Sequence, residues 1–226
     1  MAKTSTGSEL TRSEQTRQKL LLATLEVVGE HGYELATTRM LAARAGVNLA
    51  AIPYHFASKE ELVARAAEFL AEQLEQRLHQ PLLALQAASE GCTDRGQLID
   101  MLVDFMLAQA RAVLAGDVPA SWVQFFLRSQ AVAAAQPGQG SFTDVLAPSR
   151  ALVQALIGRI VGRPAQDFVC RSLGYSLFQQ VLYFRVTEGV LLQHLGRQRL
   201  SAAAGEELLR LTGISLRAQL AAHSQS

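Results

Sequence analysis

The residues best suited to chemistry lie at positions 37–62, and their types suit contacts with double-stranded DNA. A protein is positioned on DNA by contacts to phosphates and reads the sequence by contacts to base edges. Lys59 follows Ser58, a helix-capping type, so its ammonium would lie beside backbone N–H groups that also attract a phosphate. The side chains that we expect to contact phosphates are Thr38, Arg39, Arg44, Tyr54, His55 and Lys59.

Three of these side chains also fit roles without DNA. His55 could satisfy a backbone carbonyl at a helix end, and Arg39 and Arg44 could be solvated surface charges. Base contacts would come from the helix that we expect to begin near residue 48. Its candidate contacts are Asn48, Leu49, Ala50 and Ala51. That helix holds no Arg, Lys or Gln, so bidentate readout of guanine is not available from it. Alanine and leucine can contact thymine methyl groups, whereas Asn48 fits either adenine readout or an N-cap.

The apolar spacing of the same segment predicts the two short helices that would hold these side chains. Leu41, Ala42 and Ala45 recur at helical spacing and form one apolar stripe. Gly46 then ends the helix, since it adopts a left-handed conformation without a Cβ clash. Ile52 would pack back onto the stripe, and the small Ala42 lets the helices cross closely, as in a helix-turn-helix. The Ala-Gly-Val turn by itself fits an ordinary αα-hairpin equally well.

The whole segment resembles the signature of the TetR family of bacterial transcriptional regulators. The matching residues are Thr37, Thr38, Leu41, Ala42, Ala45, Gly46, Val47, Tyr54, His55, Phe56, Ser58, Lys59, Glu60 and Leu62. Met40 stands where the family often has an acidic residue, so the capping box from Thr37 loses its reciprocal half. Pro53 precedes Tyr54, where a second tyrosine is common, and should bend or shorten the recognition helix.

Two later patches look like the CecR-like subgroup of that family. They are residues 126–128, Phe-Leu-Arg, and residues 180–186, Gln-Val-Leu-Tyr-Phe-Arg-Val. The recognition helix, residues 48–52, also fits the subgroup, whereas Ser129 departs from its acidic residue after the first arginine. The resemblance implies an all-α fold: an N-terminal three-helix DNA-binding domain and a larger C-terminal helical ligand-binding and dimerisation domain.

Composition is consistent with that fold class and restricts the function. The chain has 226 residues, 49% of them hydrophobic, and no segment alternates with strand period. Its formal charge is +1, and residues 1–65 hold eight Lys/Arg against seven Asp/Glu. DNA affinity must then come from a few placed phosphate contacts rather than a broad positive field. Ala and Leu dominate a helical pattern that shows no catalytic constellation, cofactor motif or metal-ligand cluster, so we expect no enzyme.

The two cysteines, Cys92 and Cys170, form no disulfide framework and read as buried or half-buried thiols, with a redox switch as the alternative. The polar N-terminus has no signal core, and each apolar run is too short for a membrane span. We therefore expect a cytoplasmic protein that has no membrane partner.

Breaker residues divide the chain into a flexible arm at 1–11, a DNA-binding domain at 12–60 and an effector-binding and dimerisation domain at 61–226. A Pro/Gly-rich break is expected at 136–140, and a polar linker at 196–204. Outside the helix-turn-helix, the expected helices span about 13–31, 59–81, 94–114, 119–135, 142–161, 166–195 and 205–222.

The C-terminal part holds most of the aromatic residues, a stripe that by itself fits a helical core. The family resemblance implies an apolar effector cavity there, which we expect to be formed by Phe105, Trp122, Phe125, Phe126, Tyr175, Phe178 and Gln179. It also implies a homodimer in which residues 166–195 and the last helix form a four-helix bundle with their symmetry mates. A dimer fits DNA geometry too, since paired reading helices lie one helical turn of DNA apart.

These expectations describe a repressor that a small, mostly apolar effector releases from a palindromic operator. The alternative is a helical small-molecule-binding protein that acts through protein partners without specific DNA binding.

Overall fold

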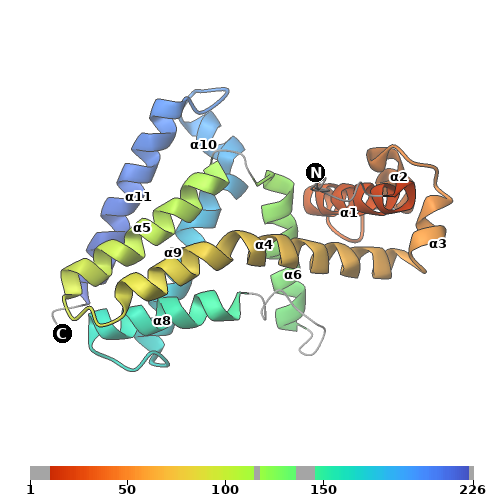
Figure 1. The fold of residues 1–226 in the computed structure, drawn as a ribbon. Helices are drawn as coiled ribbons and strands as arrows, with labels where there is room; N and C mark the ends of the chain where they lie inside the picture. Colours follow the sequence, from red (N-terminus) through yellow and green to blue (C-terminus); the bar gives the residue numbers. More distant parts are fainter. Residues whose placement is uncertain (1–10, 115–117, 136–145, 224–226) are drawn as a thin grey trace, which may run out of the picture.

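The computed structural model describes residues 11–114, 118–135 and 146–223, and no strand occurs in these ranges. A small head of three helices lies at one end, and a long helix runs from it into a larger helical body (Figure 1). The head comprises α1 (Arg12–His31), α2 (Thr38–Ala45) and α3 (Ala51–His55), and the long helix is α4 (Lys59–Ser89). The body comprises α5 (Arg95–Leu114), α6 (Ala120–Ala135), α8 (Ala147–Val161), α9 (Phe168–Val186), α10 (Glu188–His194) and α11 (Ala202–Ala222). The expected all-α architecture is confirmed.

Two apolar cores lie at different points along α4. The first joins Leu25 of α1, Leu41 of α2, Ile52 of α3 and Leu62 of α4, together with Phe125 of α6. The second fills the body, and its fully buried members include Leu102, Met106, Ile157, Leu177 and Leu216. Since α6 contributes to the first core although it follows α5 in sequence, the head does not pack on α4 alone.

Local capping signals explain where several helices begin. Glu14 N–H donates to Thr11 Oγ1, and Thr11 N–H donates to Glu14 Oε2 at 2.7 Å, which completes a capping box at the start of α1. Apart from Thr11, the expected flexible arm lies outside the described residues, as do the break at 136–140 and the expected start of a helix at 142. The expected limits of α1, α5 and α6 agree with the structure to within one residue.

The expected end of α4 near Pro81 is wrong, because the helix continues to Ser89. Proline removes one helical N–H donor and crowds the preceding turn, but packing can outweigh that cost. Leu85 beyond the proline is buried in the body core, and Leu82 packs against the same core. Arg159 of α8 also donates a hydrogen bond to the Ser89 carbonyl at 3.0 Å. Contacts with the body therefore maintain the last two turns of α4.

The single helix expected at 166–195 is also wrong, since it divides at Thr187 into α9 and α10. Thr187 Oγ1 donates to the Tyr183 carbonyl at 2.8 Å, and its backbone leaves helical geometry at φ −105° and ψ 17°. Arg185 and Glu188 form an ion pair across the break.

The last helix begins three residues before the expected position, because Ser201 Oγ accepts from Ala204 N–H and caps it.

The closest approach between the head and α6 occurs at Gly29. A Cβ placed on this residue of α1 would lie 2.0 Å from the carbonyl oxygen of Ser121 and 3.0 Å from its Cα. No side chain separates the two helices at this point, and only glycine allows the contact. Movement of α6 there must displace α1.

We expect Gly29→Ala to lower the free energy of unfolding by about 1–3 kcal/mol, since the new methyl group overlaps backbone rather than a side chain that can rotate. The matched control is Gly205→Ala, where a Cβ would meet nothing within 4 Å. That change should instead stabilise α11 by up to about 1 kcal/mol. Urea unfolding followed by circular dichroism measures both values. Equal stabilities of the two variants would contradict the close helix contact.

Candidate DNA-binding head and effector cavity

The turn between α2 and α3 is built as its sequence predicts. Thr37 Oγ1 accepts the backbone N–H of Met40 at 3.3 Å, and no reciprocal side chain completes the box. Gly46 has a left-handed backbone, with φ 65° and ψ 35°. The next residue, Val47, donates its N–H back to the Ala42 carbonyl at 3.0 Å, so the carbonyls at the end of α2 are satisfied.

The recognition segment, residues 48–55, starts with a tight turn before its short helix. Asn48 Oδ1 accepts the backbone N–H of Ala50 at 2.9 Å, so the amide caps the segment locally. Regular helix follows only over the five residues of α3. Pro53 is the third of these, a position where the missing N–H would have no intrahelical partner. The helix therefore runs through Pro53 to His55, and an effect of this proline on helix length stays a prediction.

Small and apolar side chains form the outer face of this segment. Leu49 is 43% exposed and Tyr54 79% exposed, whereas Ile52 is 3% exposed and packs into the head core. The His55 ring lies edge-on to Tyr54, with 4.8 Å between the ring centroids. A shallow hollow of about 490 Å³ lies beside these residues and is lined by Thr38, Asn48, Leu49, Ala50, Ile52 and Pro53. Four of the candidate DNA contacts therefore share one surface.

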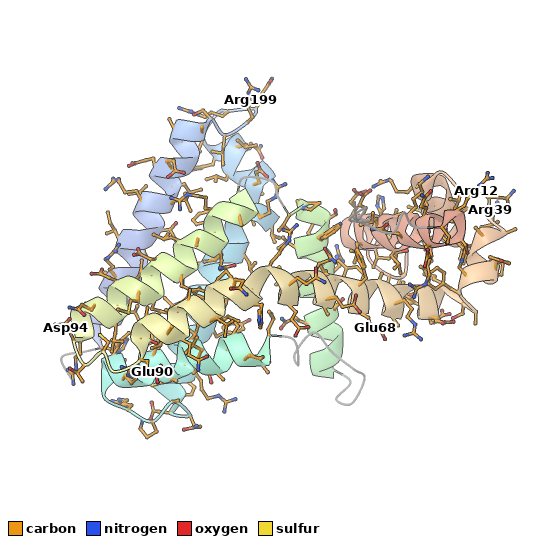
Figure 2. The ribbon with its side chains drawn as sticks, viewed as in Figure 1. Arg12, Arg39, Glu68, Glu90, Asp94 and Arg199 are labelled. Carbon is orange, nitrogen blue, oxygen red and sulfur yellow. The ribbon has the colours of Figure 1, made fainter. Side chains whose placement is uncertain are left out.

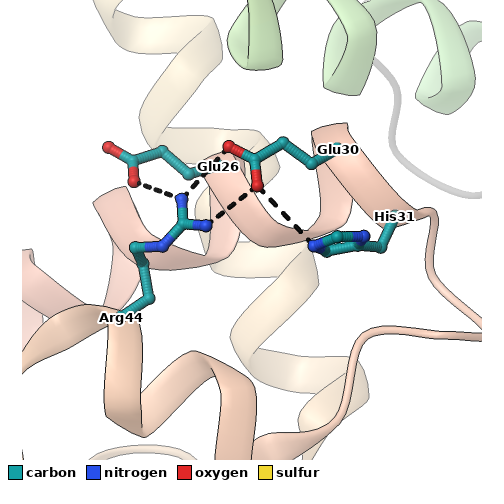
Figure 3. A network of polar contacts seen from close by, with 4 residues as sticks. All are labelled: Glu26, Glu30, His31 and Arg44. Atoms are coloured by element: carbon teal, nitrogen blue, oxygen red, sulfur yellow. Dashed lines mark hydrogen bonds and ion pairs between the residues drawn. The ribbon is translucent and has the colours of Figure 1, made fainter.

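Arg44 connects α2 to α1 instead of extending into solvent (Figure 3). Its guanidinium donates to Glu26 at 2.9 Å and to both carboxylate oxygens of Glu30, at 2.9 and 3.1 Å. These bonds raise the pKa of Arg44 and lower that of Glu30. His31 Nε2 lies 3.6 Å from Glu30. A guanidinium held by two carboxylates is better suited to positioning α2 than to contacting a phosphate.

Lys59 makes a second local link, between the loop after α1 and the start of α4. Its Nζ donates to the Tyr33 carbonyl at 2.6 Å and lies 4.0 Å from the centre of the Tyr33 ring. Tyr33 in turn donates its hydroxyl to Glu60 at 2.5 Å, which raises the pKa of Tyr33 to about 12 and lowers that of Glu60 to about 2. An ammonium has three N–H donors, so Lys59 retains donors for a phosphate.

Arg39 differs from both of these residues. It lies exposed on α2 at the tip of the head (Figure 2), and it forms no ion pair within the described part of the chain. Thr38, one residue earlier, is half-buried at the first position of α2. The geometry therefore favours Arg39 over Arg44 as a cationic contact to DNA.

A cavity of about 1350 Å³ opens in the body between α4, α5, α6, α8 and α9. Five of the seven expected residues line it: Trp122, Phe126, Tyr175, Phe178 and Gln179. Phe105 and Phe125 do not, because their positions on α5 and α6 direct them into the body core and the head core, where they are 6% and 1% exposed. Gly174 also lines the cavity, and the helix that approaches it is α8, through Gln154 and Ile157.

The aromatic pattern missed the contribution of α4 and the polar part of the lining. Leu70, Leu74, Arg77, Leu78 and Pro81 recur at helical spacing along one face of α4, so this stripe was readable from the sequence. The other polar and charged lining residues are Gln109, Gln130, Arg150, Gln154, Gln166, Arg171 and Ser172. These residues are spread over α5, α6, α8, α9 and the loop before α9, and this scatter gave no comparable signal.

Sequence comparison assigns both parts of the chain. The family model described as bacterial regulatory proteins, tetR family, matches residues 20–66. The C-terminal domain of the HTH-type transcriptional dual regulator CecR matches residues 95–223, which is more than half of the chain. The chain belongs to the TetR family of transcriptional regulators. Its C-terminal domain is of the CecR type, and the family is one of regulators rather than of enzymes.

Individual relatives are similar over different extents. The chain is 46% identical over 61 residues to the HTH-type transcriptional dual regulator CecR of Shigella flexneri, a stretch that spans 27% of each protein. The ketosteroid transcriptional regulator KstR2 of Mycobacterium tuberculosis has the same fold, with a TM-score of 0.59 at 18% identity over 93% of this chain and 95% of that one. A TetR transcription regulator of Haloarcula marismortui aligns with a TM-score of 0.52 at 19% identity, over 93% and 98% of the two chains.

Among the residues that the structure describes, no group of three or more His, Cys, Asp or Glu side chains is arranged to hold a metal ion. Within the same ranges, no helix combines the length and the apolar character needed to cross a bilayer.

The Arg44 contacts predict a salt-sensitive contribution to stability. We expect Arg44→Gln to lower the free energy of unfolding by about 1 kcal/mol at low salt, and by less at high salt. Arg65→Gln is the control, since that arginine pairs with Glu68 within α4 at 2.8 Å, and the loss of this exposed local pair should cost less stability. Urea unfolding at two salt concentrations measures the difference. A loss at Arg44 that salt leaves unchanged would rule out an electrostatic link between α1 and α2.

Proposed function

We propose that this TetR-family regulator is a homodimeric repressor that an effector in the body cavity releases from a palindromic operator. One observation carries the proposal: α6 lines the cavity at Trp122 and touches α1 of the head at Ser121. A single rigid helix thus connects the candidate effector site to the candidate DNA-binding head. Operator binding assigns the protein to the bacterial cytoplasm.

The recognition segment supports a particular mode of reading. Leu49 and Ala50 are exposed and face outward, where they would meet thymine methyl groups in the major groove. Asn48 uses its side-chain oxygen in the local cap, which leaves only its amide N–H groups to contact a base. Arg39, Thr38, Tyr54 and Lys59 would contact phosphates on either side. The segment offers contacts to thymine methyl groups and no bidentate contact from Arg, Lys or Gln. The base pairs that face it should therefore be mostly A·T.

The last helices supply a surface for dimerisation. Gln180 of α9 exchanges hydrogen bonds with Gln219 of α11 at 3.1 and 3.2 Å, and it accepts another from Ser215. This network holds α9 and α11 together as one unit. Large apolar side chains remain exposed on the same two helices, with Leu211 at 50% and Ile214 at 52%. A partner copy that packs its α9 and α11 here would bury them in a four-helix bundle.

The switch follows from the backbone contact between α6 and α1. Effector binding at Trp122 would favour one position of α6, and the contact at Gly29 converts that position into a position of α1. The two heads of the dimer then no longer match successive major grooves, so the operator is released. The effector can lower operator affinity only by as much as it binds one conformation more tightly than the other.

Phosphate contacts can be counted from the salt dependence of binding. Arg39→Ala and Lys59→Ala should each weaken operator binding and lower the slope of log K against log salt by about one unit. Arg199→Ala, on the body and away from the head (Figure 2), should leave the slope unchanged. Fluorescence anisotropy over a salt series gives the slopes. An unaltered slope for a folded Arg39 variant would remove that residue from the interface.

Operator selection from random DNA tests the proposed function directly. It should recover a palindrome whose strongest half-site positions are A·T pairs, each mismatch costing about 1–3 kcal/mol. Leu49→Ala should weaken the preference at one such position, since it removes the larger methyl contact. Guanines at the same positions would assign base reading to another side chain, such as Arg39. Failure to enrich any sequence would favour the alternative, a small-molecule-binding protein that acts through protein partners.

A further inference from the structure

The cavity carries positive charge that an apolar ligand would not use. Arg77 of α4, Arg150 of α8 and Arg171 of α9 all line it, and its described lining residues include no Asp or Glu. Guanidinium groups bind carboxylates in a bidentate manner, through two parallel N–H···O bonds. The charge of the lining therefore favours an anionic group on the ligand.

Two of the arginines are positioned by one helix pair. Residues 162–167 join α8 to α9, and Gly174 packs against Val153 and Gln154, so the helices form an antiparallel pair. Arg171 precedes Gly174 by about one turn, and Arg150 precedes Gln154 by about one turn. Along the helix axes, Arg150 and Arg171 therefore lie on either side of the point where α8 and α9 touch. Arg171 is exposed and forms no ion pair with the residues that the structure describes.

The remaining lining requires a large apolar body. Leu70 and Leu74 of α4 line the cavity together with Phe126 of α6 and Phe178 of α9. The volume of about 1350 Å³ exceeds the range of about 300–1,000 Å³ that is usual for small-molecule sites. A long or multi-ring ligand can therefore contact both the apolar side chains and the arginines.

We infer that the cavity takes an amphipathic anion, with an extended apolar body and a carboxylate or similar acidic group at the arginines. The inference rests on the proposed function, in which this cavity is the effector site, and it specifies the chemistry of the effector. Neutral and cationic amphiphiles of the same size bind more weakly.

Three probes with one alkyl chain and different head groups test the charge preference. Dodecanoate, dodecanol and dodecyltrimethylammonium are titrated into the full chain below their aggregation limits, by calorimetry and by Trp122 fluorescence. Dodecanoate should bind about tenfold or more tightly than the other two, which corresponds to about 1.4 kcal/mol. Its advantage should shrink as ionic strength rises, since salt screens the attraction.

Substitutions then assign the preference to particular side chains. Arg171→Gln and Arg150→Gln should each weaken dodecanoate binding severalfold and leave dodecanol binding unchanged. Arg163→Gln is the matched control, because Arg163 lies between the same two helices, pairs with Asp167 at 3.6 Å and does not line the cavity.

The outcomes test the proposed ligand class separately from the proposed release of the operator. Equal or tighter binding of dodecanol or of the cation overturns the inference, as does the failure of dodecanoate to bind. An equal loss in Arg163→Gln and Arg171→Gln overturns the assignment to the cavity arginines. Operator affinity is measured in parallel by anisotropy. Selective dodecanoate binding that leaves operator affinity unchanged supports the ligand class and contradicts release by an effector.

Discussion

The contact between Gly29 of α1 and Ser121 of α6 sets the relation between the head and the body. Because backbone meets backbone, neither helix can move there while a side chain absorbs the displacement. Phe125 continues the same contact, since it follows Ser121 by one turn and is buried in the head core. Trp122 and Phe126, each one position further along α6, line the cavity as well as packing on the head core. One helix thus faces the two candidate sites, and α4 is not the sole route between them.

The head uses much of its charge to hold itself together. Arg44 is engaged by Glu26 and Glu30, and Lys59 is tied to Tyr33, whose hydroxyl is bound by Glu60. These contacts join α1, α2 and the start of α4, so the head can follow α1 as one body. They also pair positive with negative side chains inside the head, which is consistent with its nearly neutral net charge. Fewer cations remain for DNA, which makes the exposed ones more important to affinity.

The cavity combines two kinds of lining that have different consequences. Its apolar part contributes affinity in proportion to the area removed from water, and that term discriminates weakly among ligands of similar size. The arginines discriminate more strongly, because a ligand that lacks an acidic group forgoes their charge-assisted hydrogen bonds. In such a site the polar minority of the lining determines which molecule acts as the effector.

The sequence by itself determined the features that depend on nearby residues. Thr37, Gly46 and Ser58 mark helix ends because capping and left-handed turns act over three or four positions. Tertiary structure decided the rest. Packing on the body extends α4 past Pro81. Residues 18 and 26 positions away determine what Arg44 and Lys59 bind, and the neighbours of α5 and α6 direct Phe105 and Phe125 away from the cavity. Local patterns record backbone geometry, whereas the partner of a side chain depends on which helices the fold brings together.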